Sequence, residues 1–224
     1  MRRFAILLSL GLLGWNNVVH LIPGASAAYV PLNLAATGVV VGAARRCGLS
    51  WGDLGLRPDR ARAGARWGGA VAAVVAGAYA VAVAVPALHP LLDDSRIRRL
   101  GPGAVAYHAL VRIPFGTVVL EEVAFRGALF GALARVTTPV RAAALSSVAF
   151  GLWHVRPTLG LLDANDVADQ PIARVGAVAG AVLFTTAGGL VFCLLRERSR
   201  STLAPMVAHT AMNSLGVLAS AAAR

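Results

Sequence analysis

The sequence has no lysine, only two cysteines and few charged side chains of any kind. Charged residues occupy 14% of its 224 positions, against about 25% in a soluble globular domain. Neither Cys47 nor Cys193 has a Cys or His neighbour at metal-ligand spacing, so both are expected to be reduced thiols that pack against their surroundings. With 57% hydrophobic residues and a mean hydropathy of +0.69, these shortages exclude an ordinary soluble domain and predict a membrane protein.

In place of charge, the sequence contains a series of long apolar runs. A helix needs about 20 residues to cross the hydrocarbon core of a bilayer. No run alternates with the two-residue period of a strand, and an open sheet edge has no place in lipid. We therefore predict an all-α, polytopic transmembrane helix bundle with about seven spans. These runs cover residues 4–22, 27–44, 67–88, 104–134, 142–154, 172–195 and 202–221.

The basic residues, all of them arginine, indicate how the bundle is oriented. They lie between apolar runs, where they act as topology signals, so nucleic acid is not expected as a partner. Placing the N-terminus in the cytoplasm puts the Arg-rich segments 45–66, 135–141 and 196–200 inside and the acidic segment 163–169 outside. The sequence thus predicts an integral protein of a bacterial cytoplasmic membrane. The connector 45–66 is predicted to be either an amphipathic segment lying on anionic lipid or a solvated loop.

The first apolar run resembles a secretory signal, because two arginines precede it and small residues follow it. The polar cluster Trp15, Asn16 and Asn17 interrupts that pattern. We therefore expect residues 1–27 to be retained as the first helix rather than cleaved.

The fourth predicted span contains three ionisable residues, Glu121, Glu122 and Arg126. Each charge costs roughly 2.5–3.5 kcal/mol to insert, so their presence needs a reason. Glu122 and Arg126 are four residues apart and can form an ion pair on one helix face, while Glu121 points about 100° away from Glu122. The pair alone could equally be a structural tie. Gly127 and Gly131 are expected to let a neighbouring helix approach closely.

Two other predicted spans offer polar partners for Glu121. Phe150 and His154 share one face of the fifth span, and His209 and Asn213 share one face of the seventh. A single membrane histidine is often a hydrogen-bonded packing residue, and an asparagine can simply stabilise a helix contact. The combination on three helices indicates a functional site, because a purely structural bundle would use apolar residues at these positions.

These residues match the motifs of a known family. The run EEVAFRG at 121–127 resembles the EExxxR motif of the CAAX-protease and bacteriocin-processing family of intramembrane endopeptidases. Phe150 with His154 is similar to the family's FxxxH motif, and His209 with Asn213 to its HxxxN motif. The resemblance covers about residues 104–221. It divides the chain into N-terminal transmembrane helices with the Arg-rich connector, 1–103, and a protease-like core, 104–221.

The resemblance implies hydrolysis of a peptide bond in a peptide or protein substrate, which can be membrane-anchored or lipidated. Glu121 with His154 would activate the attacking water, and His209 with Asn213 would stabilise the oxyanion. Glu122 and Arg126, with Phe150 as a further supporting residue, would hold the site. The chemistry agrees, since a buried carboxylate can deprotonate water and amide or imidazole donors can stabilise negative charge at low dielectric.

No metal or other cofactor is expected, but a zinc alternative exists. Glu121, His154 and His209 would form a His₂Glu ligand set suited to catalytic zinc. The sequence lacks the compact H-E-x-x-H arrangement, which favours the metal-free glutamate mechanism.

Two functions of other classes would also fit such a bundle. One is a non-catalytic membrane protein, such as an immunity or scaffold protein, that has kept the site architecture. The other is a small transporter or proton relay that uses the carboxylates. The sequence has no repeat symmetry of the transporter kind, and the intact polar residues favour the peptidase.

Overall fold

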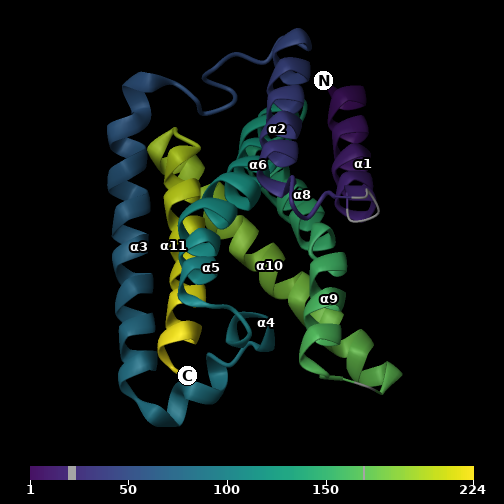
Figure 1. The fold of residues 1–224 in the computed structure, drawn as a ribbon. Coiled ribbons are helices and arrows are strands. Elements are labelled where there is room, and N and C mark those ends of the chain that lie inside the picture. The colour runs from purple at the N-terminus through teal and green to yellow at the C-terminus, as the bar shows by residue number, and fades with distance from the viewer. Residues whose placement is uncertain (20–23, 169) are drawn as a thin grey trace.

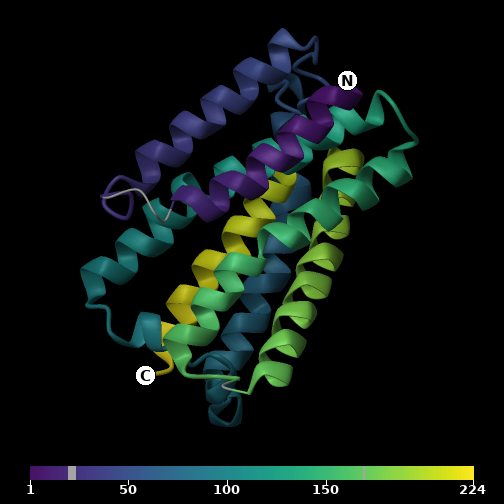
Figure 2. The same cartoon turned by 90° about the vertical axis from the view of Figure 1, so that its right-hand side faces the viewer.

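The computed structural model describes residues 1–19, 24–168 and 170–224, and within these ranges its regular elements are all helices. They form a tilted bundle (Figures 1 and 2). The predicted all-α fold is therefore confirmed. Six of the predicted runs correspond to α1 Arg2–Val18, α2 Tyr29–Arg46, α3 Ala61–Ala84, α8 Pro139–Trp153, α10 Pro171–Ser199 and α11 Leu203–Ala222. Residues 20–22 of the first predicted run lie outside the described residues.

The remaining predicted run forms one continuous helix over residues 102–134 with two widened stretches. Pro114, which has no N–H to donate, lies in the first of them and disrupts the α-helical hydrogen-bond pattern there. The two stretches are π-helical, and π-helical turns are frequent at functional sites. Glu121 therefore lies on a short α-helical turn between two π segments. The helix consists of α5 Pro102–Tyr107, η4 His108–Val118, α6 Val119–Glu121, η5 Glu122–Leu129 and α7 Phe130–Ala134.

Three of the described helices are long and apolar enough to cross a bilayer. They are Pro58–Ala84, Pro102–Ala134 and Pro171–Ser199. These helices support the membrane class, and the total of about seven spans stays a prediction.

The structure also contains helices where the sequence analysis expected loops. The longest is α9 Val155–Asn165, which follows α8 after the single residue His154. A proline in its first turn is compatible with a helix start, and Leu162 is buried. His154 thus lies at a junction between two helices rather than at the end of a span. The others are η2 Pro58–Arg60, η3 Pro86–Leu91 and α4 Ser95–Arg98.

Small residues allow the helices to approach closely. α3 and α11 lie side by side (Figure 1), and a Cβ added to Gly68 would lie 2.5 Å from the Ala204 carbonyl oxygen. Between α8 and α10, a Cβ added to Gly189 would lie 2.9 Å from the Cβ of Ser147. Such contacts replace the hydrophobic effect as the source of association between helices in lipid.

The connector between α2 and α3 packs into the bundle, which neither predicted description anticipated. Leu49 and Leu54 are fully buried, and the Thr202 hydroxyl donates a 2.7 Å hydrogen bond to the Leu54 carbonyl oxygen. A Cβ added to Gly131 would lie 2.7 Å from the Asp53 carbonyl oxygen, and one added to Gly127 would lie 3.2 Å from that of Leu54. The expectation that these glycines admit another helix was therefore wrong, because they admit the connector.

Asp53 links this connector to Arg135, the residue that follows the 102–134 helix, through an ion pair. Its carboxylate accepts hydrogen bonds of 3.1 and 2.6 Å from the Arg135 guanidinium and one of 2.7 Å from the Ser50 backbone N–H. The hydrogen bond from Arg135 is the largest cause that lowers the pKa of Asp53 from 3.8 to about 2. The carboxylate is therefore ionised throughout the neutral range.

This lowered pKa predicts a specific sensitivity to acid. A folded-state pKa below the unfolded value stabilises the protein above the unfolded pKa, and this contribution is lost as the pH falls from 3.8 to about 2. The thermal midpoint of the wild type should therefore fall more steeply over this interval than that of Asp53→Asn. Asp163→Asn, which removes an exposed ion pair with Arg174, is the control and should track the wild type. Equal slopes for wild type and Asp53→Asn would contradict the assignment.

Candidate active site

Glu121 and Glu122 are both buried in the middle of the bundle. Glu122 is 0% exposed and Glu121 is 6% exposed. Burial of an ionised carboxylate is costly unless partners compensate for the lost hydration. The surroundings of the two side chains therefore decide what each of them can do.

Glu122 is compensated by two partners from different helices. Its Oε1 accepts a 3.1 Å hydrogen bond from Nη1 of Arg126 and lies 2.7 Å from Nδ1 of His209. The predicted ion pair between positions 122 and 126 is present, and both side chains are fully buried. Because an ionised carboxylate can only accept, Nδ1 of His209 carries the proton in this contact. Glu122 thus fixes the orientation of the His209 ring and ties α11 to the 102–134 helix.

His209 presents its second nitrogen to two further residues. The amide nitrogen of Asn213 lies 3.1 Å from Nε2 of His209, so the predicted pairing of these residues on α11 is observed. Nε2 of the same ring lies 3.8 Å from Oε2 of Glu121. That distance is too long for a hydrogen bond, but it shows that the His209 imidazole lies next to the Glu121 carboxylate as well as the Glu122 carboxylate.

Glu121 has a hydrogen-bond partner that the sequence analysis did not name. The indole Nε1–H of Trp153 donates a 2.9 Å hydrogen bond to Oε1 of Glu121. The backbone carbonyl of Trp153 in turn accepts a 2.7 Å hydrogen bond from the side-chain amide of Asn16. The other oxygen of Glu121, Oε2, is buried and has no hydrogen-bond partner among the described residues. One oxygen is therefore fixed, and the other remains available as an acceptor.

Aromatic rings enclose the charged residues. Cζ of Arg126 lies 3.9 Å from the ring centroid of Phe150 and 5.0 Å from that of Phe192. The Phe192 ring also stacks on His209, with centroids 5.0 Å apart and an interplanar angle of 28°. Cation–π contacts of this kind strengthen when water is excluded. They compensate the Arg126 guanidinium, whose Nε and Nη2 have no hydrogen-bond partner in the described part of the chain.

His154 joins the site through Phe150 rather than by direct contact with Glu121. Within the described residues, no hydrogen bond or ion pair connects His154 to Glu121. Nδ1 of His154 lies 2.8 Å from the Phe150 carbonyl oxygen, so it carries the proton and leaves Nε2 free in the neutral ring. The Phe150 ring contacts His154 at 4.5 Å and His209 at 6.0 Å between centroids. The side chain is half-buried at the junction of α8 and α9.

The N-terminal helices also contribute to the surroundings of Glu121. A cavity of about 10 Å³ adjoins this residue, close to the lower limit for a single water molecule. Trp15, Asn16 and Asn33 line it, and the indole of Trp15 donates a 3.0 Å hydrogen bond to Asn33. Sequence reasoning confined the site to residues 104–221 and missed this side. The signal was present in the polar cluster at 15–17, which interrupts the first apolar run.

The zinc ligand set does not assemble in this arrangement. No three His, Cys, Asp or Glu side chains of the described residues are grouped so that they could hold a metal ion together. Glu121 and His209 approach each other at 3.8 Å, whereas no ion pair joins His154 to either of them among the described residues, and the Phe150 ring contacts both histidines.

The fold and this cluster define a class of protein. It is a helical membrane protein in which several helices contribute buried ionisable residues. The model of the family described as type II CAAX prenyl endopeptidase Rce1-like matches residues 103–215, which contain all three motifs. The chain therefore belongs to the Rce1-like family of type II CAAX prenyl endopeptidases, and the resemblance read from the motifs is confirmed. No curated protein and no solved structure matches the chain.

Proposed function

We propose that the chain is an intramembrane endopeptidase in which Glu121 activates the water that attacks the peptide bond. The observation that carries the proposal is the contrast between the two carboxylates. Each has one buried oxygen without a hydrogen-bond partner among the described residues, but Glu122 is paired with Arg126, whereas Glu121 is paired with no arginine. Trp153 fixes Oε1 of Glu121, while its Oε2 is buried, has no partner among the described residues and faces His209 at 3.8 Å. A general base needs this combination of a fixed orientation and a free acceptor oxygen. Membership of a peptidase family supports the same chemistry.

The proposed reaction begins with a water molecule hydrogen-bonded to Oε2 of Glu121. As the carboxylate accepts a proton, the water oxygen attacks the carbonyl carbon of the scissile bond and forms a tetrahedral oxyanion. The C–N bond then breaks, and the proton held by Glu121 passes to the leaving amine. The products are a new carboxylate and a new amine. His154, whose Nε2 is free in the neutral ring, is assigned to assist the proton transfers from the side of α8.

His209 and Asn213 are assigned to the oxyanion. In the resting arrangement, Nε2 of His209 accepts a hydrogen bond from Asn213. Glu122 lies 2.7 Å from the opposite nitrogen, Nδ1, and so fixes the ring beside the site. As the oxyanion forms, the Asn213 amide can turn from Nε2 and donate to it, with the imidazole of His209 beside the same oxygen. The site excludes water, and such interactions are strongest there.

The proposed substrate is a peptide or protein held in or near the bilayer, because Glu121 lies 19 residues inside the 102–134 helix. The proposed mechanism is metal-free. A chelator should leave the rate of peptide cleavage unchanged, whereas inhibition that added zinc reverses would support the zinc alternative.

The indole of Trp153 is proposed to be a positioning group for the general base. Trp153→Phe keeps an aromatic ring against Phe125, with which Trp153 makes an edge contact at 5.6 Å, but removes the donor to Glu121. A hydrogen bond to a charged group is worth about 1.5–3 kcal/mol, so kcat should fall roughly 10- to 100-fold with KM nearly unchanged. The matched control is Trp67→Phe, which makes the same change at an indole of α3 that is 45% exposed and does not line the cavity beside Glu121. A KM effect without a kcat effect, or equal losses in both variants, would refute the positioning role.

A comparison in cells would test the proposed activity and identify its substrate. Peptides that accumulate in membranes should be compared between cells with the wild type and cells with Glu121→Gln. The proposal predicts at least one intact peptide that accumulates only with the variant. A phenotype of the protein that survives Glu121→Gln would instead favour a non-catalytic immunity or scaffold function.

A further inference from the structure

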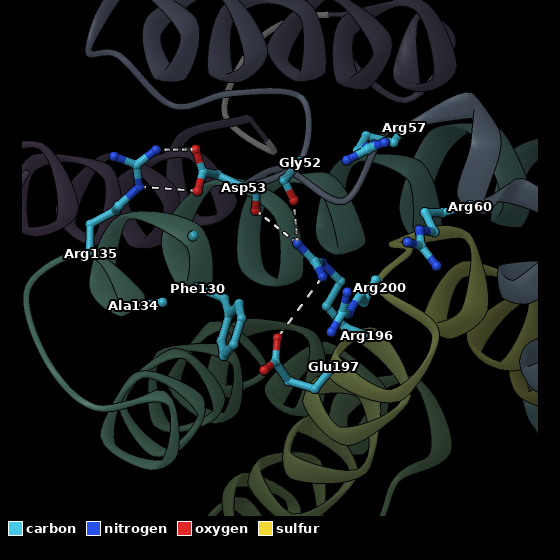
Figure 3. Close-up of a pocket in the computed structure, with 11 residues that line it drawn as sticks. Gly52, Asp53, Arg57, Arg60, Phe130, Ala134, Arg135, Arg196, Glu197 and Arg200 are labelled. Atoms are coloured by element: carbon cyan, nitrogen blue, oxygen red, sulfur yellow. Dashed lines mark hydrogen bonds and ion pairs between the residues drawn. The ribbon is translucent and has the colours of Figure 1, made fainter.

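A second pocket opens at the end of the bundle that carries the N-terminus and the connector. Its volume is about 360 Å³, and it lies where three candidate membrane spans end (Figure 3). Pro58–Ala84 begins beside it, and Pro102–Ala134 and Pro171–Ser199 finish beside it. The positive-inside rule predicts this end to be cytoplasmic. None of the residues proposed for peptide cleavage lines the pocket. Its lining includes Arg57, Arg60, Arg135, Arg196, Arg200, Asp53 and Glu197.

The charges around the pocket are not balanced. The Asp53 carboxylate forms an ion pair with the Arg135 guanidinium at 2.6 Å. Arg57 is paired at 2.8 Å with Asp59, which lies just outside the lining. Arg60 reaches that same aspartate only at 3.7 Å.

The last arginine of the lining, Arg200, is not paired with Glu197, which faces Arg196 instead. Arg200 is exposed and forms no ion pair in the part of the chain that the structure describes. The five arginines against two acids leave the lining with an excess of three positive charges.

The Arg196 side chain is buried in the lining of this pocket and is held there by hydrogen bonds. It is 5% exposed, and its Nη2 donates 2.9 Å hydrogen bonds to the carbonyl oxygens of Gly52 and Asp53. Its Nη1 faces Glu197 at 4.0 Å, too far for a hydrogen bond, and its Nε has no partner among the described residues. Gly55 packs on the same guanidinium with φ +66°, where a Cβ would overlap it. The connector therefore holds a buried cation in the lining of the pocket. The Nε of Arg196 packs against Gly55, so Nη1 is the donor that remains for a ligand.

The position of the pocket fits the membrane–water interface. Trp51 and Trp67, at the same end of the bundle, are 48% and 45% exposed, and tryptophan is enriched at membrane interfaces. Clusters of arginine at this depth attract anionic headgroups, and the guanidinium fork matches phosphate geometry. We propose that the pocket binds the phosphate group of an anionic phospholipid. Arg60 and Arg200 supply the uncommitted charges, and Arg196 supplies the fixed one.

The test uses the purified full-length chain in detergent with phosphatidylglycerol added at increasing concentration. Phosphatidylglycerol should raise the thermal midpoint, and native mass spectrometry should detect retained lipid, whereas phosphatidylcholine should do neither. The double variant Arg60→Gln/Arg200→Gln removes both uncommitted charges and leaves the buried Arg196 intact. Its affinity for phosphatidylglycerol should be lower by roughly 30-fold, about fivefold for each charge.

The control double variant is Arg2→Gln/Arg3→Gln, which removes the same charge at the same end of the bundle but outside the pocket. It should retain the wild-type affinity. Equal losses in both double variants would show diffuse attraction and overturn the proposal, as would no preference for phosphatidylglycerol. Glycerol phosphate is the second probe. If glycerol phosphate does not raise the thermal midpoint, the phosphate site is assigned to lipid. If it raises the midpoint as much as phosphatidylglycerol does, the site is supported but is assigned to a soluble phosphate.

Discussion

Glu121→Gln is expected to lower kcat/KM for cleavage of a membrane-anchored peptide by roughly 10²–10⁴-fold. General-base catalysis contributes this much, and an amide cannot accept a proton from water near neutral pH. Glutamine has nearly the same shape and can still accept the hydrogen bond from Trp153, so the loss should fall on chemistry rather than on folding. The measurement is a progress curve of peptide cleavage with the purified variant and the wild type at equal concentration.

Two controls separate a loss of catalysis from a loss of folding. The thermal midpoint of Glu121→Gln should stay close to that of the wild type. Asp93→Asn, which removes an exposed carboxylate paired with Arg98 at 3.0 Å, should cleave at the wild-type rate. If Glu121→Gln were within a few-fold of the wild type, Glu121 could not be the general base.

Arg126→Met is expected to lower the free energy of unfolding by about 3–5 kcal/mol. This substitution removes one partner of a fully buried ion pair and leaves the Glu122 carboxylate without its fixed counter-charge. It also removes the cation from between the rings of Phe150 and Phe192. The loss should appear in denaturant unfolding of the purified protein in detergent and, through the contact of Glu122 with His209, as reduced activity.

A second substitution separates charge from packing. Arg126→Met/Glu122→Gln leaves no charge at either position of the pair, and the amide oxygen introduced at position 122 can still accept a hydrogen bond from His209. The double variant should therefore be more stable than Arg126→Met alone. If the second substitution destabilised the protein further by its full individual amount, the two residues would not be coupled, and the proposed role of the pair would be wrong.

Local sequence patterns predicted the parts of the site that depend on one helix. Four-residue spacing places Glu122 beside Arg126 and His209 beside Asn213, and both contacts are present. The membrane class followed from composition because an apolar run of about 20 residues has few other stable locations. The family relation followed from three motifs that occur in order along the chain.

Contacts between distant segments could not be predicted in the same way. Trp153 donates to Glu121 from 32 positions away, and Asn16 reaches the Trp153 carbonyl across 137 positions. Such pairings depend on how whole helices are tilted and rotated, which no local period encodes. A uniform turn of about 100° per residue also neglected the π-helical stretches on either side of Glu121. Among the described residues no hydrogen bond or ion pair joins His154 to the carboxylate, whereas Trp153, one residue earlier, donates to it.

The burial of the connector could not be predicted from its own sequence. Leu49 and Leu54 occur among arginines, a pattern that suits either a surface helix or a loop. Their burial depends on Gly127 and Gly131, which lie more than 70 positions later and leave room for the connector backbone. Only the assembled bundle shows that this segment is part of the core.

The most direct measurement of the central claim is mass spectrometry of a membrane-anchored peptide after incubation with the purified protein and a chelator. If Glu121 activates water without a metal, the wild type should yield two fragments from one peptide bond, with a new carboxylate and a new amine, and Glu121→Gln should leave the peptide intact. Equal fragments from both proteins, or cleavage by the wild type only after zinc is restored, would contradict it.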